Sequence, residues 1–420
     1  MNTEYFDALE IRSPEVREAD LFERLPKLLA HAQTHSAGWA TILEGHDAQS
    51  INSRERLAAL PVTRKSDLKE RQQNYPPLGA LNATPLTDLA HLYLSPGPIL
   101  DIDGSTNDWW RVARALFAAG VRRGNIIQNC FSYHFTPAAF MVETGARALG
   151  CPVVPAGVGQ IDLQLEALTR LNVQAYCGTP SFLRIILERA AELHIKLPNL
   201  SRALMTAEAL PPSLKNWFID QGIAYPLQWY GTADLGLLAY ESAHTQDQDG
   251  LIVEEQILFE IVKPGTNQPV PAGEVGEVVV TSFNADYPLI RFSTGDLSAI
   301  LPDSLHTPAP CGRTNVRIKG WMGRADQAVK VRGMFVQPAQ IALVIKKYPT
   351  VTRARLVVQG EMGQDRMTLY CEIQQNSVGL VSAIQQTIRE VINLRAEVIF
   401  QGLGTLPNDG KVIEDLRDYR

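Results

Sequence analysis

Lys411 lies close to the end of this 420-residue chain, within the sequence Leu-Pro-Asn-Asp-Gly-Lys-Val of residues 406–412. Proline and glycine bend this segment, so the lysine is a positive charge that can be carried to another part of the molecule. An ammonium group can stabilise the negative charge that gathers on a phosphate and on an attacked carboxylate. The alternative is a solvated lysine on a tail, and three upstream motifs decide between the two.

The first motif, Gln-Trp-Tyr-Gly-Thr-Ala-Asp, ends a predicted strand at residues 228–234. It presents an aromatic ring, a glycine (Gly231), a hydroxyl and a carboxylate where open α/β sheets bind ligands, so it can form a nucleotide crevice. Tyr230 would lie on adenine, Thr232 would bond to a phosphate oxygen, and Asp234 would hold Mg²⁺, which prefers hard oxygen ligands. The alternative is a strand-end turn before a capped helix.

The second motif, Arg-Phe-Ser-Thr-Gly-Asp, covers residues 291–296. On a glycine turn, the carboxylate of Asp296 would accept both ribose hydroxyls, although Thr-Gly-Asp is also a common turn. Glu208 lies at the end of another predicted strand, which begins near Arg202. That segment either borders the adenine or is a plain strand end.

The third motif, Gly-Arg-Ala-Asp, covers residues 323–326. Arg324 would reach the ribose, and Asp326 would be the pivot between two domains. A surface turn that carries a salt bridge is the alternative. Together, the motifs occur in one order and at consistent intervals, which is far more specific than any of them alone.

The composition describes a globular protein of more than one domain. A length of 420 residues exceeds the usual size of one hydrophobic core. The chain is 45% hydrophobic and 20% charged, and its net charge of −6 argues against a nucleic-acid surface. Its start lacks the features of a signal peptide, and no apolar run reaches the ~18 residues of a membrane span. We expect a cytoplasmic protein with no nucleic-acid and no membrane partner.

The five cysteines also favour a location in the cytoplasm. They are odd in number and scattered, and most lie in apolar stretches. Buried free thiols in a reducing cytoplasm are therefore the favoured interpretation, and disulfides are the alternative. These residues are Cys130, Cys151, Cys177, Cys311 and Cys371.

The apolar pattern predicts an α/β protein. Between residues 105 and 230, helices alternate with short strands, which indicates crossover units on a parallel sheet. Residues 250–302 indicate an antiparallel β subdomain. We expect a large N-terminal domain over residues 1–323, with these parallel-sheet layers plus the antiparallel subdomain, and a small mobile C-terminal α+β domain over residues 324–420. The elements expected along the whole chain include helices over 106–119, 137–149, 161–171, 338–347 and 378–393, and a last strand over 396–401.

The ordered motifs resemble the signature of the adenylate-forming superfamily, and the chain looks most like its phenylacetate–CoA ligases over nearly the whole length. Residues 57–68 resemble that family's Leu-Pro-x-Thr-x-x-Asp-Leu segment, and residues 148–155 resemble its Leu-Gly-Cys-x-Val-x-Pro strand. Residues 178–181 resemble its Thr-Pro-Ser segment, and residues 311–314 resemble its Cys-Gly-Arg-Thr turn.

The resemblance implies a reaction in two halves. A carboxylate, expected to be aromatic, attacks the α-phosphate of Mg·ATP and gives an acyl-adenylate and pyrophosphate. The thiolate of CoA, or of a carrier-protein pantetheine, then displaces AMP. The resemblance also implies that the small domain swings about Asp326, so that Lys411 serves adenylation and residues 323–333 serve thioester formation.

The chain departs from the resemblance at the phosphate loop. Relatives have a Ser/Thr/Gly-rich loop with a lysine, whereas residues 92–101 read Leu-Tyr-Leu-Ser-Pro-Gly-Pro-Ile-Leu-Asp. Only Ser95 and Gly97 are left to cradle pyrophosphate, because the prolines delete two amide donors. Asp101 and Asp103 add negative charge nearby.

Two further departures concern metals. The resemblance places a metal-binding Glu at Asp234, whose side chain is one methylene shorter. Relatives often carry a zinc cluster, but Ala309 stands two residues before Cys311, and Ile252 stands where a His would be expected. The nearby histidines do not restore tetrahedral spacing, so no zinc is expected.

The acid is expected to bind along residues 132–137, Ser-Tyr-His-Phe-Thr-Pro, where relatives have a glycine-rich segment that admits an aryl ring. Tyr133 and Phe135 would wall a flat apolar acid. Packing of both rings in the core is the alternative. His134 is either a polar contact or a surface histidine.

The leading hypothesis is an AMP-forming acid–thiol ligase that uses ATP, Mg²⁺ and CoA or a pantetheine thiol. The alternative is a nucleotide- or adenylate-binding protein with weak or lost turnover, motivated by the altered phosphate loop and opposed by the retained Lys411. Transfer of the acyl group to an amine is a third hypothesis. The sequence leaves open the acid, the acceptor and the oligomeric state, a homodimer included.

Overall fold

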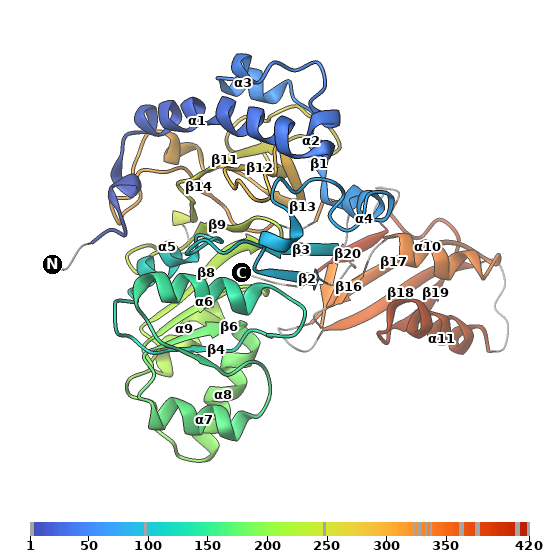
Figure 1. Ribbon diagram of the computed structural model, residues 1–420. Helices are drawn as coiled ribbons and strands as arrows, with labels where there is room; N and C mark the ends of the chain where they lie inside the picture. The colour runs from blue at the N-terminus through green and yellow to red at the C-terminus, as the bar shows by residue number, and fades with distance from the viewer. Residues whose placement is uncertain are drawn as a thin grey trace. The chain divides into compact units, whose positions relative to one another are not determined.

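The computed structural model describes residues 4–95, 99–246, 249–322, 324–325, 329–332, 334–336, 338–360, 365–373, 379–407 and 412–417. The chain divides into two compact units, residues 1–322 and 323–420, coloured blue to orange and orange to red in Figure 1. Each unit has its own hydrophobic core. The mixed α/β class that the sequence predicts is confirmed.

An eight-stranded sheet is the centre of the first unit. Its parallel part contains, in spatial order, β5 (Val153–Pro155), β4 (Ile127–Asn129), β6 (Ala175–Gly178), β7 (Arg202–Met205) and β8 (Tyr225–Thr232). Antiparallel strands extend it through β9 (Gly236–Tyr240), β10 (Leu251–Val253) and β14 (Arg317–Ile318).

Four helices connect the parallel strands as crossovers, as the sequence predicts. They are α6 (Ala138–Leu149), α7 (Ile161–Arg170), α8 (Pro180–Glu192) and α9 (Pro212–Asp220). The predicted start of α8 is confirmed, because Thr179 accepts the Phe182 N–H and Pro180 occupies the first turn. The strand order reverses between β4 and β6, and open α/β sheets commonly bind ligands at the carboxyl ends of the strands at such a point.

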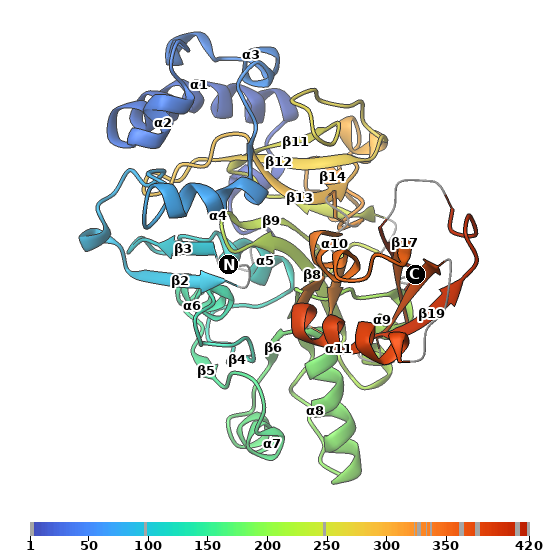
Figure 2. The same ribbon diagram turned by 90° about the vertical axis from the view of Figure 1, so that its right-hand side faces the viewer.

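A second sheet confirms the antiparallel β subdomain. Its order is β1 (Thr63–Arg64), β13 (Phe292–Ser298), β12 (Gly276–Ser282) and β11 (Ile257–Val262), and only β1 pairs in parallel. Figures 1 and 2 both show the N-terminal helices at this end of the unit, opposite α7 and α8. These helices are α1 (Pro14–His35), α2 (Ala37–Ile42), α3 (Arg54–Ala58) and α4 (Lys65–Asn74).

A β-hairpin of β2 (His91–Ser95) and β3 (Ile99–Asp103) lies beside α4. The Gln72 amide of α4 donates to the Leu100 carbonyl at 2.7 Å and accepts the Leu100 N–H at 2.8 Å. These two bonds satisfy the backbone groups of Leu100 on the edge of β3 with which no other described strand pairs. They also fix β3 relative to the first residue of α4.

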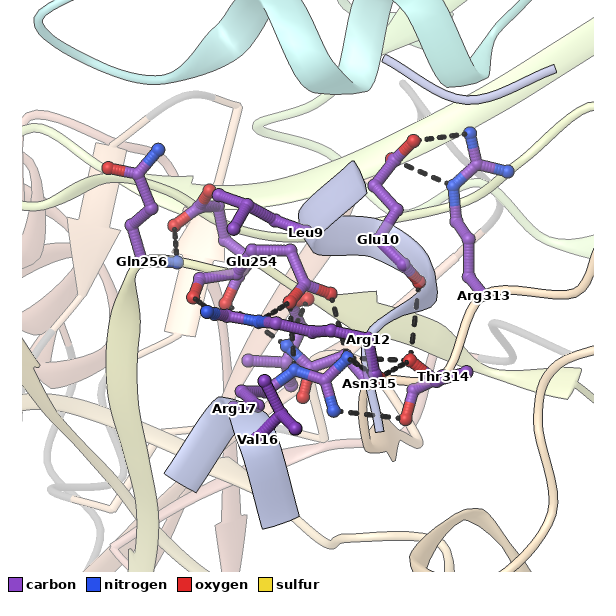
Figure 3. A network of polar contacts seen from close by, with 12 residues as sticks. Leu9, Glu10, Arg12, Val16, Arg17, Glu254, Gln256, Arg313, Thr314 and Asn315 are labelled. Carbon is purple, nitrogen blue, oxygen red and sulfur yellow. Dashed lines mark hydrogen bonds and ion pairs between the residues drawn. The ribbon is translucent and has the colours of Figure 1, made fainter. Parts of the chain in front are cut away.

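Buried ion pairs brace the N-terminal segment against the first unit (Figure 3). Glu10 is fully buried, and it accepts bonds from Arg313 Nε and from the Tyr240 hydroxyl, each at 2.8 Å. Arg17 pairs with Glu255 at 2.8 Å and donates to the Thr314 hydroxyl at 2.7 Å. The Cys-Gly-Arg-Thr turn of residues 311–314 therefore anchors the start of the chain.

The second unit is a four-stranded sheet with helices. Its strands are β19 (Glu397–Gln401), β18 (Arg366–Ile373), β17 (Val351–Gln359) and β20 (Ile413–Asp415), in that spatial order. Helices α10 (Pro338–Lys346) and α11 (Leu380–Ile392) contribute to its core. A separate pair is formed by β15 (Val329–Val331) and β16 (Met334–Val336). The sequence did not predict β20.

Two local predictions are wrong. The helix expected over 106–119 is shorter, since α5 covers only Val112–Ala118. Asp108 and Arg111 have φ angles of 51° and 65°, and the Asp108 carboxylate accepts the Ala113 N–H, so this segment turns before the helix starts. Residues 293–296 form part of β13 rather than a free turn, although Gly295 has a φ of 75°.

Candidate functional site

Two of the predicted nucleotide motifs meet in the first unit, where β8 approaches β13. The Tyr230 hydroxyl donates to Asp296 Oδ2 at 2.8 Å and lies 3.3 Å from the Thr294 hydroxyl. The Trp321 indole donates to Asp296 Oδ1 at 3.2 Å. These bonds orient both oxygens of the Asp296 carboxylate, which is only 7% exposed. Tyr230 thus positions Asp296, a contact that the sequence did not suggest.

The turn after β8 explains Gly231 and Thr232. A Cβ atom at Gly231 would lie 2.5 Å from the Gly236 carbonyl oxygen, so only glycine allows β8 and β9 to approach here. The Thr232 hydroxyl accepts the Leu235 N–H at 3.2 Å. These contacts close the turn that carries Asp234.

Asp234 is paired with a lysine that the sequence analysis did not single out. Nζ of Lys65, the first residue of α4, lies 2.5 Å from Asp234 Oδ2. Burial disfavours the ammonium form, but the charges of Asp234, Asp101 and Asp296 outweigh it and raise the pKa of Lys65 above its ordinary value. The lysine therefore stays protonated at neutral pH.

Asp101 of β3 brings a second carboxylate to this pair. It is 1% exposed, and side-chain hydrogen bonds with Ser95 and with Asp234 act on its carboxyl group. Burial and then the charge of Asp234 raise its pKa to about 8. The hydroxyl of Tyr287, which is 2% exposed, has a side-chain hydrogen bond with Gln72. Burial and the two carboxylates raise the pKa of Tyr287.

These groups fit a hard cation of the magnesium type. Mg²⁺ takes oxygen ligands, keeps several waters, and often needs only one or two protein carboxylates besides substrate phosphates. Asp234 and Asp101 offer carboxyl oxygens to such an ion, although the Lys65 ammonium already donates to Asp234 and burial favours the protonated form of Asp101. Within the described ranges, no group of three or more His, Cys, Asp and Glu side chains is arranged to hold a metal.

Ser95 and Glu208, the other predicted nucleotide contacts of this unit, have local partners. The Ser95 hydroxyl donates to the Ile99 carbonyl at 3.1 Å, across the hairpin. Glu208 accepts the N–H and the hydroxyl of Ser181 at 3.0 and 2.9 Å, at the first turn of α8. Gly97 lies outside the described residues.

The predicted acid-pocket residues differ in their surroundings. The Tyr133 hydroxyl donates to Glu143 at 2.9 Å and accepts from the Asn129 amide at 3.0 Å, just beyond β4. Phe135 is 75% exposed and has a φ of 62°, so it does not form a pocket wall within the described residues. Neither of two surface hollows, lined by segments of α7 and α8 and by residues 168–173 and 196–200, includes a predicted site residue.

The remaining predicted residues belong to the second unit. Lys411 and Asp326 lie outside the described residues, and Arg324 is partly exposed. Two hydrogen bonds fix the backbone at Leu406 and Pro407, shortly before Lys411 in the sequence. The Leu406 N–H donates to Glu372 at 2.7 Å, and Arg353 donates to the Pro407 carbonyl at 2.8 Å.

Residues 108–285 match the family model described as "AMP-binding enzyme". The phenylacetate-coenzyme A ligase of Pseudomonas putida is 27% identical over 430 aligned residues, which cover 96% of this chain and 95% of the relative. The phenylacetate-coenzyme A ligase of Thermus thermophilus is 28% identical over 368 residues, covering 84% and 80% respectively.

Solved structures share the fold. A 2-hydroxyisobutyryl-CoA ligase, determined with 2-HIB-AMP and CoA, has a TM-score of 0.81 at 22% identity. The match covers 100% of this chain and 94% of that chain. No described helix has both the length and the apolar character needed to cross a membrane.

Proposed function

We propose that this chain joins a small, aromatic carboxylic acid to CoA with the cleavage of ATP, because residues 108–285 match the AMP-binding enzyme family model and the chain is similar to phenylacetate–CoA ligases over nearly its whole length. In the first half-reaction, the acid's carboxylate attacks the α-phosphorus of ATP and pyrophosphate leaves. In the second, the CoA thiolate attacks the acyl carbonyl and AMP leaves. The observation that carries the proposal is the meeting of Tyr230 with Asp296, close to the Lys65–Asp234 pair.

Asp296 is suited to bind the ribose. Tyr230 and Trp321 each donate to one of its oxygens, and a carboxylate oxygen can accept more than one hydrogen bond. The carboxylate would therefore meet the nucleotide already oriented. Gly231, Thr232 and Glu208 are proposed to border the nucleotide, with Ser95 at its phosphates.

Lys65 and Asp234 are suited to the phosphates. Asp234 would hold Mg²⁺, which neutralises phosphate charge when it is bound. The Lys65 ammonium has three N–H groups, of which Asp234 accepts one. Lys65 would serve in place of the lysine that the relatives' phosphate loop carries and that residues 92–101 lack.

The second unit is proposed to complete each half-reaction. Lys411 would stabilise the charge on the α-phosphate and the attacking carboxylate, and Arg324 would reach the ribose. Asp326 would be the hinge. Tyr133, beyond β4, would line the acid site, where its bonds to Glu143 and Asn129 fix its ring. All five cysteines are free and buried, which supports a cytoplasmic location.

ATP–pyrophosphate exchange with a panel of aromatic and short-chain acids tests the proposal. We expect acid-dependent exchange in the wild type and a loss of ~100-fold or more in Lys411→Ala, because one charge-stabilising group is typically worth that much. Lys347→Ala, an exposed lysine of the same unit, is the matched control. ATP binding by calorimetry without exchange for any acid would refute the proposal. Addition of CoA or of a pantetheinylated carrier protein then identifies the acceptor.

A further inference from the structure

The second half of the proposed reaction leaves one proton without an assigned acceptor. The acceptor thiol must lose its proton, because the thiolate is the nucleophile. Thiols titrate near about pH 8.5 in model peptides, so most of the acceptor is protonated at neutral pH. Lys65 is an ammonium that already donates to Asp234, so it cannot take this proton. A positioned base near the acyl group would speed the step by roughly 10²–10⁴-fold.

A histidine and a buried aspartate on the β2–β3 hairpin have the geometry of such a base. Nδ1 of His91 lies 2.9 Å from Oδ1 of Asp103, whose side chain is 2% exposed. The Tyr93 hydroxyl donates to the other oxygen, Oδ2, at 3.0 Å. Since a carboxylate oxygen accepts hydrogen bonds, Nδ1 carries the proton and Nε2 carries the lone pair. In this orientation an aspartate holds a histidine that acts as a general base.

The His91 ring is fixed in place and remains accessible. Its centroid lies 4.7 Å from that of Phe140 on α6 and 5.7 Å from that of Tyr93. The His91 side chain is nevertheless 46% exposed, and no described residue bonds to its Nε2. The ring is therefore oriented by Asp103 and its two aromatic neighbours, while a thiol can approach it from solvent.

The hairpin that carries His91 borders both parts of the proposed substrate site. On the acid side, the Phe140 ring that packs on His91 also packs on Tyr133, with centroids 5.5 Å apart. On the phosphate side, Asp101 lies two residues before Asp103 on the same face of β3, about 7 Å away. Its carboxyl group has a side-chain hydrogen bond with Asp234. The acyl carbonyl forms where the acid meets the α-phosphate, so this hairpin is well placed to supply a base.

We propose that His91, oriented by Asp103, is the general base that activates the acceptor thiol. The inference rests on the proposed function, to which it adds a residue for the second half-reaction. Nε2 takes the proton as the S–H bond breaks, and the sulfur forms a bond to the acyl carbon. The bond from that carbon to the phosphate oxygen breaks with its electron pair, so AMP leaves. The imidazolium then returns its proton to water.

The charged surroundings suit a histidine that becomes an imidazolium. The titratable side chains on the elements packed against His91 are Asp103 and Tyr93 of the hairpin, Glu143 and Arg147 of α6, and Tyr133 and His134 of the loop before α6. Asp103 contacts the ring directly and is buried, so its negative charge favours the protonated imidazole. Glu143 lies within one turn of Phe140 and adds a second negative charge.

Single-turnover thioester formation from the enzyme-bound acyl-adenylate and CoA tests the inference, with the acid that gives the fastest pyrophosphate exchange. Relative to exchange in the same variant, this step should slow about 100-fold in His91→Gln and about tenfold or more in Asp103→Asn. Imidazole added to His91→Ala should restore part of the rate, which a purely structural histidine would not show. His35→Gln, at an exposed histidine of α1, is the matched control.

The pH profile of the thiol step is a second readout, and the wild type alone suffices for it if a variant fails to fold. We expect the wild-type rate to level off near neutral pH, where a histidine base is already deprotonated. The His91→Gln rate should keep rising toward about pH 8.5 with the fraction of free thiolate. Equal slowing of both half-reactions in His91→Gln, or a wild-type rate that keeps rising, would overturn the inference and leave the proposed function in place. A wild type without pyrophosphate exchange for any acid would remove both.

Discussion

The hydroxyl of Tyr230 donates a 2.8 Å hydrogen bond to Asp296 across 66 positions of sequence. Tyr230 belongs to the eight-stranded sheet and Asp296 to the four-stranded sheet, so this bond joins the two sheets at the predicted nucleotide site. Trp321 supplies the second contact to Asp296. The carboxylate is therefore pre-oriented by groups from both sides, and each group can be removed separately.

Tyr230→Phe should raise the KM for ATP about tenfold or more and change kcat little, because the lost bond orients Asp296 rather than the reacting atoms. A hydrogen bond to a charged group is worth about 1.5–3 kcal/mol. Initial-rate kinetics with ATP varied would measure the effect. Tyr75→Phe, at a tyrosine that is 58% exposed, should be neutral. A loss of kcat with unchanged KM would contradict this assignment.

Lys65→Met should destabilise the first unit and weaken ATP binding. The substitution leaves Asp234, whose side chain is fully buried, without its ammonium partner. Such an unpaired buried charge typically costs about 3 kcal/mol. Urea unfolding would measure the loss, and added Mn²⁺ should restore part of it. Lys69→Met, on the exposed side of the same helix, should change neither property.

Glu10→Gln should lower the free energy of unfolding by about 3 kcal/mol, because it leaves Arg313 buried beside a neutral amide. Tyr240 would keep an acceptor, since the amide oxygen remains. Chemical denaturation measures the change, and Glu23→Gln on exposed α1 surface is the control. A change in the free energy of unfolding below about 0.5 kcal/mol would mean that the Glu10–Arg313 ion pair contributes little to stability.

Asp108 should make stability fall as pH rises. Burial raises the pKa of Asp108 to about 7, above the unfolded value of about 4. The folded state therefore binds this proton more tightly, and the associated stability is complete below pH ~4 and lost as pH rises through ~7. In Asp108→Asn, the drop in unfolding free energy between pH 4.5 and 8 should be smaller. Asp88→Asn, at an exposed carboxylate, should keep the wild-type drop.

Periodicity predicted most of the architecture. Regular alternation identified the parallel strands and the crossover helices, because each of these elements has one buried face that sequence spacing reveals. Periodicity wrongly extended the helix into the segment before α5. Asp108 and Arg111 take left-handed backbone conformations there, which no apolar pattern signals. The short strand β20 lacks enough residues to show a period.

The site was predictable only in part. Motifs named Tyr230, Asp234 and Asp296, but the contact of Lys65 with Asp234 joins residues 169 positions apart. Which side chains meet over such a distance depends on the packing of α4 against β13 and β3. The available signal was two acidic residues, Asp101 and Asp103, in a strand whose other residues are apolar.

The brace between Glu10 and the turn at Arg313 has a consequence for how the protein is made. The ribosome releases the N-terminal segment long before it translates its partners, because 303 positions separate the two residues. At ~5–20 residues per second, the first ~20 residues wait for at least ~15 s. During that interval, Leu21 and Leu25, which are buried in the folded protein, are not yet packed in a completed core. Nascent chains stalled before Arg313 has left the ribosome should thus be sensitive to protease near their start, and chains long enough for residues 311–314 to have emerged should be resistant.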